Sequence, residues 1–323
     1  MKKINQMLFG IISIWIVLSI IFGFFDLEIS KFAVNYKESH WAIVGEKYCN
    51  KIDIPLLFLG LTILIGSVFN NIKSQQKVGF IMILYSIINL FFIIVTKEGI
   101  EVFSALLLVI FLCIFMFLTY NKNWRNYIPI AISLILLIIF LDLIVEIMKF
   151  LWGRVRFNNL SSDTEFTEWY IINGNGLDHD HKSFPSGHAA TGWSFLPFLF
   201  LLKDKQIKRR NKFIIVIFVI GYGLFTAISR VLAGEHYASD VLFSTGIASL
   251  IIIFIYKLLI NLDLNMEKVD QNLSNKTITI KHSDLINQWF VSYVKRNGKK
   301  IFFWFATNKD LINFLISSNL IKD

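Results

Sequence analysis

Three short polar stretches interrupt the long apolar runs of this chain, and each carries residues that could handle a phosphate group. They are Lys149 with Arg154 and Arg156, then Pro185-Ser186-Gly187-His188, then Ser229-Arg230 followed by His236 and Asp240. Guanidinium groups bind two phosphate oxygens at once, and backbone amides at the start of a helix attract anions. Histidine suits proton transfer or nucleophilic attack near neutral pH. The set therefore predicts a phosphate cradle that contains a nucleophile.

Carboxylates near these stretches have spacings that indicate supporting roles. Asp240 follows His236 by four residues, so one helical turn would bring its carboxylate beside the imidazole. Asp142 and Glu146 lie one turn apart just before Lys149, and charges inside an apolar run are rare. Two interpretations stay open: one of these acids orients Lys149 or another cation of the site, or both lie in the wet membrane interface.

The composition places these stretches in a membrane protein. Of 323 residues, 55% are hydrophobic and only 17% are charged, and the mean hydropathy is +0.60, which excludes an ordinary soluble globular domain. The long Ile, Leu and Phe runs exclude a disordered chain, and no internal repeat indicates a solenoid. Cys49 lies in a polar loop and Cys113 in an apolar run, so no internal disulfide is expected.

Eight segments approach the roughly 20 apolar residues that a helix needs to cross a bilayer. They cover residues 7–25, 54–69, 78–95, 102–120, 127–148, 186–202, 213–233 and 241–260. The first resembles a signal peptide but lacks a small-residue cleavage site after Phe25, so we expect a retained helix. The prediction is an all-α integral membrane protein with about eight transmembrane helices.

The distribution of basic residues predicts an orientation in the membrane. The net charge is +9, but Lys and Arg lie mostly between apolar segments without the aromatic interleaving of a nucleic-acid surface, so no nucleic-acid partner is expected. With a cytoplasmic amino terminus, the inner segments, above all 203–212, are richer in Lys and Arg than the outer ones. Both termini are then cytoplasmic, and the three polar stretches lie on the outer face of the plasma (cytoplasmic) membrane.

Residues 264–323 are more polar and are predicted to form a small α+β cytoplasmic appendage. Residues 277–281 and 300–305 have the composition of strands, and Asn297-Gly298 that of a turn. Asn308 would cap a helix that runs to Leu320. An aromatic cluster in this region is interpreted as a small core, with contact to the membrane surface as the alternative.

Taken together, the three stretches resemble the signatures of the type 2 phosphatidic acid phosphatase (PAP2) family, which also contains the vanadium haloperoxidases. The family signatures are Lys-x6-Arg-Pro, Pro-Ser-Gly-His and Ser-Arg-x5-His-x3-Asp. This chain has Lys149-x6-Arg156, Pro185-Ser186-Gly187-His188 and Ser229-Arg230-x5-His236-x3-Asp240. The resemblance spans about residues 127–260 and implies a six-helix PAP2-like core within the eight predicted helices.

The first signature departs from the family pattern. Where the family commonly has Gly-Arg-Pro-Arg-Pro, this chain has Val155 and Phe157 in place of the two prolines. Proline would stiffen the loop, so its loss is expected to loosen the presentation of Arg156. No charge that binds phosphate is lost.

The resemblance implies a role for each matching residue. His236 would be the nucleophile that forms a phosphohistidine, Asp240 would orient its imidazole, and His188 would be the general acid. Phosphate binding would fall to Lys149, Arg156, Ser186, Gly187 and Arg230, with Arg154 and Glu146 as accessory residues. No metal or other cofactor is implied, because the cations do the neutralising that magnesium does elsewhere. The implied partners are a membrane lipid phosphate and the bilayer; the oligomeric state is not predicted.

One alternative site competes with this interpretation. Asp178-His179-Asp180-His181 alternates carboxylate and imidazole, which suits a divalent metal. The stretch follows a glycine-rich segment at residues 174–176, so the simpler interpretation is a solvated outer loop near the mouth of the site.

We thus predict three regions: N-terminal transmembrane helices in residues 1–126, about four in number, a PAP2-like catalytic region in 127–260, and a small cytoplasmic domain in 261–323. The predicted activity is metal-independent hydrolysis of a phosphomonoester or pyrophosphate on a lipid such as phosphatidate or phosphatidylglycerophosphate. The alternatives are a polyprenyl pyrophosphate phosphatase, a lipid phosphotransferase and, from another class, a non-catalytic lipid-phosphate binding or transport protein.

Overall fold

The protein is mostly helical. The computed structural model describes residues 2–49, 51–96, 99–174, 176–204, 207–270, 278–283, 288–294, 300–305 and 310. The helices are α1 (Lys2–Ala33), α2 (His40–Tyr48), α3 (Asp53–Ser67), α4 (Ile72–Thr96), α5 (Gly99–Leu118), α6 (Ile128–Trp152), α7 (Gly187–Gly192), α8 (Arg209–Leu232) and α9 (Ala238–Asp270). Short 3₁₀ helices lie at Val34–Tyr36, Trp124–Tyr127, Phe157–Asn159, Asp163–Glu165, His179–His181 and Leu196–Lys203.

Six of the described helices are long and apolar enough to cross a membrane. They are α1, α4, α5, α6, α8 and α9, and a seventh span results if α2 and α3, which meet at a bend of 47°, act as one broken span. Their outer faces carry exposed large apolar side chains such as Phe24, Phe91 and Phe117. Lipid is the solvent in which such faces are stable, so the protein is an integral membrane protein.

This count differs from the eight spans predicted from hydropathy, because the two shortest segments are not long helices. Segment 54–69 corresponds to α3, which has 15 residues. Segment 186–202 is divided between α7 and the 3₁₀ helix Leu196–Lys203, which has Pro197 in its first turn. Ala189, Ala190 and Ser194 of this segment are buried in the protein. An apolar run inside a bundle has the same composition as one that faces lipid, so hydropathy does not separate the two.

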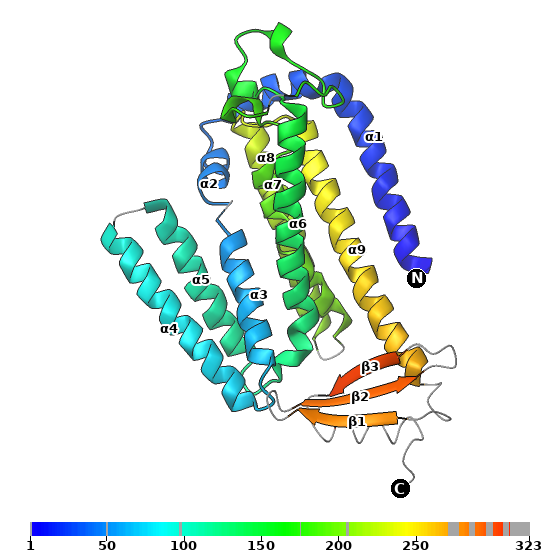
Figure 1. The fold of residues 1–323 in the computed structure, drawn as a ribbon. Coiled ribbons are helices and arrows are strands. Elements are labelled where there is room, and N and C mark those ends of the chain that lie inside the picture. Colours follow the sequence, from blue (N-terminus) through cyan, green and yellow to red (C-terminus); the bar gives the residue numbers. More distant parts are fainter. Residues whose placement is uncertain are drawn as a thin grey trace.

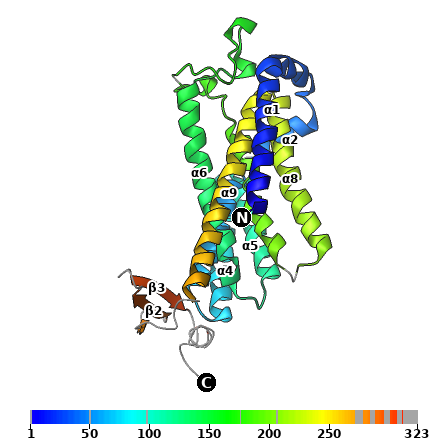
Figure 2. The ribbon, with the colours of Figure 1, turned by 90° about the vertical axis from the view of Figure 1, so that its right-hand side faces the viewer.

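Helix α6 forms the centre of the bundle, with α3 on one side and α9 on the other (Figure 1). Leu134, Leu137 and Leu141 of α6 are buried in one apolar core with Leu56 and Ile63 of α3. Helix α1 packs along α9, as Figure 2 shows from the side. The amino-terminal helix is therefore part of the same packed body as the predicted catalytic region.

The arrangement of helix ends positions the site. Helices α6 and α8 end, and α7 and α9 begin, at the same end of the bundle, where a long loop lies over them (Figure 1). These four ends carry the three polar stretches. The turns between helices thus bring together residues that are up to 91 positions apart in sequence, Lys149 and Asp240 being the outermost pair.

A small antiparallel sheet lies at the opposite end of the bundle (Figure 1). Its strand order is β1-β2-β3, with β1 (Ile278–Ser283), β2 (Gln288–Val294) and β3 (Lys300–Phe305). β1 and β3 coincide with the two predicted strands, whereas β2, which pairs Trp289 with His282 and Phe305, was not predicted as a strand. The predicted turn at Asn297-Gly298 and the helix from Asn308 to Leu320 lie outside the described residues.

Candidate active site

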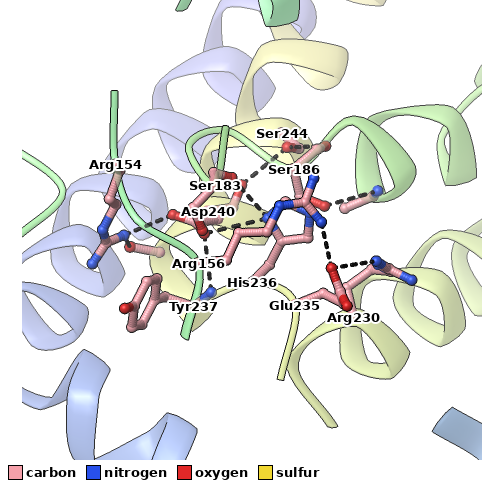
Figure 3. A network of polar contacts seen from close by, with 12 residues as sticks. Arg154, Arg156, Ser183, Ser186, Arg230, Glu235, His236, Tyr237, Asp240 and Ser244 are labelled. Atoms are coloured by element: carbon pink, nitrogen blue, oxygen red, sulfur yellow. Dashed lines mark hydrogen bonds and ion pairs between the residues drawn. The ribbon is translucent and has the colours of Figure 1, made fainter. Parts of the chain in front are cut away.

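The polar stretches meet in one network of contacts at the end of the bundle (Figure 3). The first stretch follows α6, the second begins α7, and the third joins α8 to α9. The predicted residues whose side chains this arrangement brings to the same end are Lys149, Arg154, Arg156, Ser186, His188, Arg230, His236 and Asp240. They divide into a histidine–carboxylate group and a group of cations, with different contacts.

A glycine at the end of α6 turns the chain into the site. Gly153 caps the helix with a φ of 55°, and its N–H donates to the carbonyl of Lys149. A Cβ at this position would lie 1.8 Å from the carbonyl oxygen of Gly174. Glycine alone adopts this backbone conformation without strain and leaves room for the carbonyl. The turn delivers Arg154 and Arg156 to two different sets of partners.

His236 is enclosed in the site, with 1% of its surface exposed. Its Nδ1 lies 2.7 Å from the carbonyl oxygen of Ser183 and 3.4 Å from Oδ2 of Asp240. Because a carbonyl oxygen only accepts hydrogen bonds, Nδ1 must carry the proton. Nε2 then holds the free lone pair, as a nucleophile requires. The nearest group that sets this tautomer is the Ser183 carbonyl, with Asp240 as a longer second contact.

The ring of His236 is uncharged at neutral pH. Burial lowers its pKa to about 4, against the opposing effect of Asp240 and with help from Arg230 and Arg156. An imidazole at pH 7 in this position is therefore ready to attack an electrophile without first losing a proton.

Asp240 is fully buried and makes four polar contacts. Its Oδ1 accepts from Nη1 of Arg154 at 2.6 Å, and its Oδ2 accepts from the Ser183 hydroxyl at 2.5 Å and from the backbone N–H of Tyr237 at 3.0 Å. The fourth contact is the one to His236. A carboxylate held by this many donors stays ionised and fixed, so it can stabilise positive charge on the imidazole.

Arg154 is committed to buried partners and does not join the phosphate-binding cations. Its Nη2 pairs with Asp26 at 2.9 Å, its Nη1 with Asp240, and its Nε donates to the carbonyl of Thr167. Its guanidinium also lies 4.0 Å from the centre of the Tyr237 ring. In Figure 3 Asp240 lies between Arg154 and the pair Arg156 and Arg230. The predicted accessory role of Arg154 on the phosphate is replaced by a role in holding Asp240.

Asp26 is a residue of this network that the sequence did not reveal. It is 1% exposed, pairs with Arg154, and accepts from both the backbone N–H and the hydroxyl of Ser239. It comes from α1, far outside the region with the family signatures. In the sequence it directly follows the apolar run 7–25, so it was indistinguishable from an interfacial charge at a helix end. An acid at the end of the apolar run, followed two residues later by Glu28, was the only signal in the sequence.

Arg156 is held firmly although both prolines of the family pattern are missing. Its backbone N–H donates to the carbonyl of Asp180, and its Nε donates to the carbonyl of His179 at 3.2 Å. The backbone N–H of Asn158 donates in turn to Gly234. The expected loosening of Arg156 is thus opposed by the 178–181 loop, whose backbone takes over the restraint that the prolines give elsewhere.

The same loop contains the Asp178 to His181 stretch that the sequence offered as an alternative metal site. Among the residues that the structure describes, no three His, Cys, Asp or Glu side chains are placed to hold a metal ion together. His179 and Asp180 are largely exposed and 3.8 Å apart. The backbone carbonyls of both residues accept hydrogen bonds from Arg156, so the loop helps to hold that arginine in place.

Arg156 and Arg230 share the carboxylate of Glu235. Nη1 of Arg156 pairs closely with Oε2 of Glu235, and Nη2 of Arg230 lies 3.6 Å from the same oxygen. Arg230 is 2% exposed, and its Nε and Nη1 have no hydrogen-bond partner among the residues that the structure describes. Buried donors without partners are costly, so this corner of the site is prepared for a further anion. The sequence had assigned no role to Glu235.

Lys149 lies on the other side of the site and is paired with Glu146. Its Nζ is 2.6 Å from Oε1 of Glu146, and it lies next to Gly187, where an added Cβ would come within 3.1 Å of it. The contact agrees with the interpretation that Glu146 orients Lys149. Asp142 does not contact Lys149 directly but lines a cavity of about 340 Å³ with Glu146 and His188.

Ser186 makes contacts within the chain at the start of α7. Its hydroxyl accepts from the N–H of Ala189, and its own backbone N–H donates to the carbonyl of Asp240. Both groups are therefore engaged, and Ser186 ties α7 to the start of α9. The carbonyl of Ser186 also accepts from Ser244, which strengthens this link.

His188 is half-buried and lines the cavity together with the acidic residues Asp53, Asp142 and Glu146. Burial, followed by the charge of Arg230, places its pKa well below the usual value, so the ring is neutral at pH 7. A group with this position is able to exchange a proton with whatever occupies the cavity.

The fold and the site together define an integral membrane protein with two histidines, a buried carboxylate and a cluster of cations at one end of a helix bundle. Residues 130–263 match the family model described as the PAP2 superfamily. This part of the chain carries all three signatures, so the match is consistent with a PAP2 family member and confirms the resemblance seen in the sequence. Comparisons with curated proteins and with solved structures found no match.

Proposed function

We propose that the protein is a phosphatase of lipid phosphates that works through a phosphohistidine at His236. The observation that carries this proposal is the state of His236: it is buried, neutral, and protonated on Nδ1 by its contact with the Ser183 carbonyl. Its Nε2 lone pair is thus available next to the guanidinium groups of Arg156 and Arg230. The match to the PAP2 superfamily supports the same class of reaction.

In the first step, Nε2 of His236 attacks phosphorus and the bond from phosphorus to the lipid oxygen breaks. Arg156, Arg230 and Lys149 neutralise the charge on the three other phosphate oxygens. Asp240 stabilises the positive charge that develops on the imidazole. His188 gives a proton to the departing lipid oxygen, so the lipid leaves as an alcohol. A bound phosphate dianion offsets the cations around His188, which allows that ring to hold the required proton.

In the second step, water cleaves the phosphohistidine. His188, now neutral, takes a proton from a water molecule, whose oxygen attacks phosphorus. The phosphorus–nitrogen bond breaks, inorganic phosphate leaves, and His236 returns to its neutral form. The cavity beside His188 gives room for the leaving alcohol and then for the water. The proposal needs no metal, because the charge on phosphorus is met by protein cations.

The test is phosphate release by purified protein in detergent with EDTA, from phosphatidate, phosphatidylglycerophosphate and a polyprenyl pyrophosphate. We expect release from at least one diacyl phosphate, together with ³²P on His236 after rapid quenching. Preference for the pyrophosphate would reassign the substrate class, and transfer to an added lipid acceptor would indicate a phosphotransferase. Tight phosphate binding with no release from any substrate would favour a non-catalytic binding or transport protein and contradict the proposal.

We also propose that both termini are cytoplasmic and that the site opens at the outer face of the plasma membrane. The excess of Lys and Arg at the end of the bundle opposite the site supports this orientation. The division into regions 1–126, 127–260 and 261–323 is kept as part of the proposal, with one change. Helix α1 contributes Asp26 to the buried network, so the catalytic unit includes the amino-terminal helix.

The orientation is tested with single cysteines in a chain whose Cys49 and Cys113 are replaced by serine. Cys49 itself is a poor reporter because it is buried, although the sequence placed it in a polar outer loop. Leu177→Cys, at an exposed position, is expected to react with an impermeant maleimide in intact cells. Lys208→Cys, exposed at the other end, is the matched control and should react only after permeabilisation. The reverse pattern would overturn the orientation.

A further inference from the structure

Glu235 occupies a position in the site that a phosphate group would be expected to fill. Its Oε2 contacts Arg156 and lies 3.6 Å from Nη2 of Arg230, and its Oε1 lies 3.5 Å from Nδ2 of Asn158. Arg156 and Arg230 are the two guanidinium groups that the family signatures assign to phosphate. In the described structure they hold this carboxylate of the chain itself, which directly precedes His236 in sequence (Figure 3).

The carboxylate fills the anion site only in part. Nε and Nη1 of Arg230 are buried and have no hydrogen-bond partner within the described part of the chain, although Nη2 of the same group faces Glu235. Two guanidinium groups carry two positive charges, and one carboxylate supplies a single negative charge. The side chain of Glu235 is 22% exposed, whereas that of Arg230 is 2% exposed, so the carboxylate is the more movable member of the pair.

Glu235 is ionised at neutral pH. Burial opposes the charge, but Arg230 and then Arg156 outweigh it and hold the pKa of Glu235 below its usual range. A ligand that binds these arginines must therefore compete with a real negative charge. Two anions within the same site repel each other, and in a partly buried site this repulsion is large.

We propose that Glu235 acts as a built-in competitor that lets phosphate dianions bind and keeps phosphate monoanions out. This proposal rests on the proposed function of the site as a lipid phosphate site. A terminal phosphate carries up to two charges and three free oxygens, enough to displace one carboxylate and to satisfy the free donors of Arg230. A phosphodiester carries one charge and two free oxygens, so it gains little over the carboxylate that it would replace.

Selection against monoanions matters for a membrane protein, because phosphodiester headgroups surround its site. The bilayer around the bundle consists mostly of phosphodiester lipids, whose headgroups are present at far higher concentration than any lipid with a terminal phosphate. Without competition, a site with three cations would be occupied by those headgroups. A displaceable carboxylate lowers the apparent affinity for every competing anion by the same factor, so a weakly held diester is lost from the site while a dianion, which binds the arginines more tightly, remains.

The test compares Glu235→Gln with the wild type by direct binding of inorganic phosphate, using calorimetry in detergent at pH 8. We expect the variant to bind phosphate about tenfold more tightly or more, since a like charge has been removed from the site. Phosphatidylglycerol, a monoanionic diester, should compete with phosphate in the variant and have little effect in the wild type. Glu235→Asp, which keeps the charge on a shorter side chain, should lie between the two.

The matched control is Glu38→Gln, which removes the same charge from an exposed position just before α2. It should leave phosphate affinity and diester competition unchanged within about twofold. A Glu235→Gln protein that binds phosphate more weakly than wild type or equally well, with an unchanged unfolding temperature, would overturn the proposal and make Glu235 a mere support for the arginines. If that variant does not fold, the same comparison with Glu235→Asp decides. Binding is measured without turnover, so a wild type that fails to hydrolyse lipid phosphates counts against the proposed function alone.

Discussion

Replacement of His236 by alanine is expected to lower kcat/KM for phosphate release by about 10⁴-fold or more, because no other group can form the covalent intermediate. The geometry makes this loss specific: the Ser183 carbonyl fixes the proton on Nδ1, and burial keeps the ring neutral, so only Nε2 is presented for attack. The measurement is phosphate release from phosphatidate in detergent micelles, with KM and kcat determined separately. Binding of inorganic phosphate should change much less, because Arg156 and Arg230 remain.

The companion variant His188→Ala separates nucleophile from general acid. With a substrate whose leaving group is already a weak base, such as p-nitrophenyl phosphate, this variant should still form the phosphoenzyme, since no proton needs to be donated. Its hydrolysis needs the base, so labelled His236 should accumulate. His40→Ala, at an exposed position of α2, is the control for loss of an imidazole and should retain full activity. Wild-type activity in the His236→Ala protein would refute the histidine mechanism.

Replacement of Arg154 by methionine is expected to destabilise the protein by about 3–5 kcal/mol, which is as much as many membrane and soluble domains can lose before unfolding. The change leaves the carboxylates of Asp26 and Asp240 buried without the cation between them, and both are at most 1% exposed. It also removes donors from Thr167 and Ser239. The readouts are the unfolding temperature in detergent and the amount of monodisperse protein.

Arg156→Met is the matched comparison, because it removes the same guanidinium group from a position two residues further along the same loop. Its partner Glu235 is 22% exposed and keeps Arg230 as a second cation, so the free energy of unfolding should fall by less than in Arg154→Met. Phosphate binding should instead weaken and kcat/KM should fall by about 10²-fold or more. Equal stability of the two variants would contradict the structural role of Arg154. Loss of phosphate binding in a fully folded Arg154→Met protein would indicate that Arg154 contacts phosphate.

The residues of the candidate site could be selected from the sequence because they lie in short local motifs. His236 and Asp240 lie one helical turn apart, and Pro185 to His188 form one uninterrupted stretch, so their proximity does not depend on the rest of the fold. The membrane class followed from composition, since lipid as a solvent imposes long apolar helices on any chain that crosses it. Those inferences needed no knowledge of packing.

The helix count was less predictable, for a physical reason. Segment 186–202 is apolar because it fills the interior of the bundle around Ala190 and Ser194, whereas α4 is apolar because it faces lipid. Hydropathy measures only the preference to leave water, which is the same in both places. Whether such a run crosses the membrane depends on which neighbours cover it.

Which charges pair with which was decided only by the tertiary structure. The sequence shows two arginines two residues apart after Gly153, with no sign that Arg154 would turn to Asp26 and Asp240 while Arg156 would meet Glu235. Asp26 and Arg154 are separated by 128 positions, and only the packing of α1 along α9 brings them within 2.9 Å. A buried ion pair requires both partners to leave water together, so its existence depends on the shape of the assembled core and not on the local sequence around either residue. Motif spacing by itself determined which residues are candidates for the site, and the folded bundle determined that Arg154 pairs with Asp26 and Asp240 whereas Arg156 pairs with Glu235.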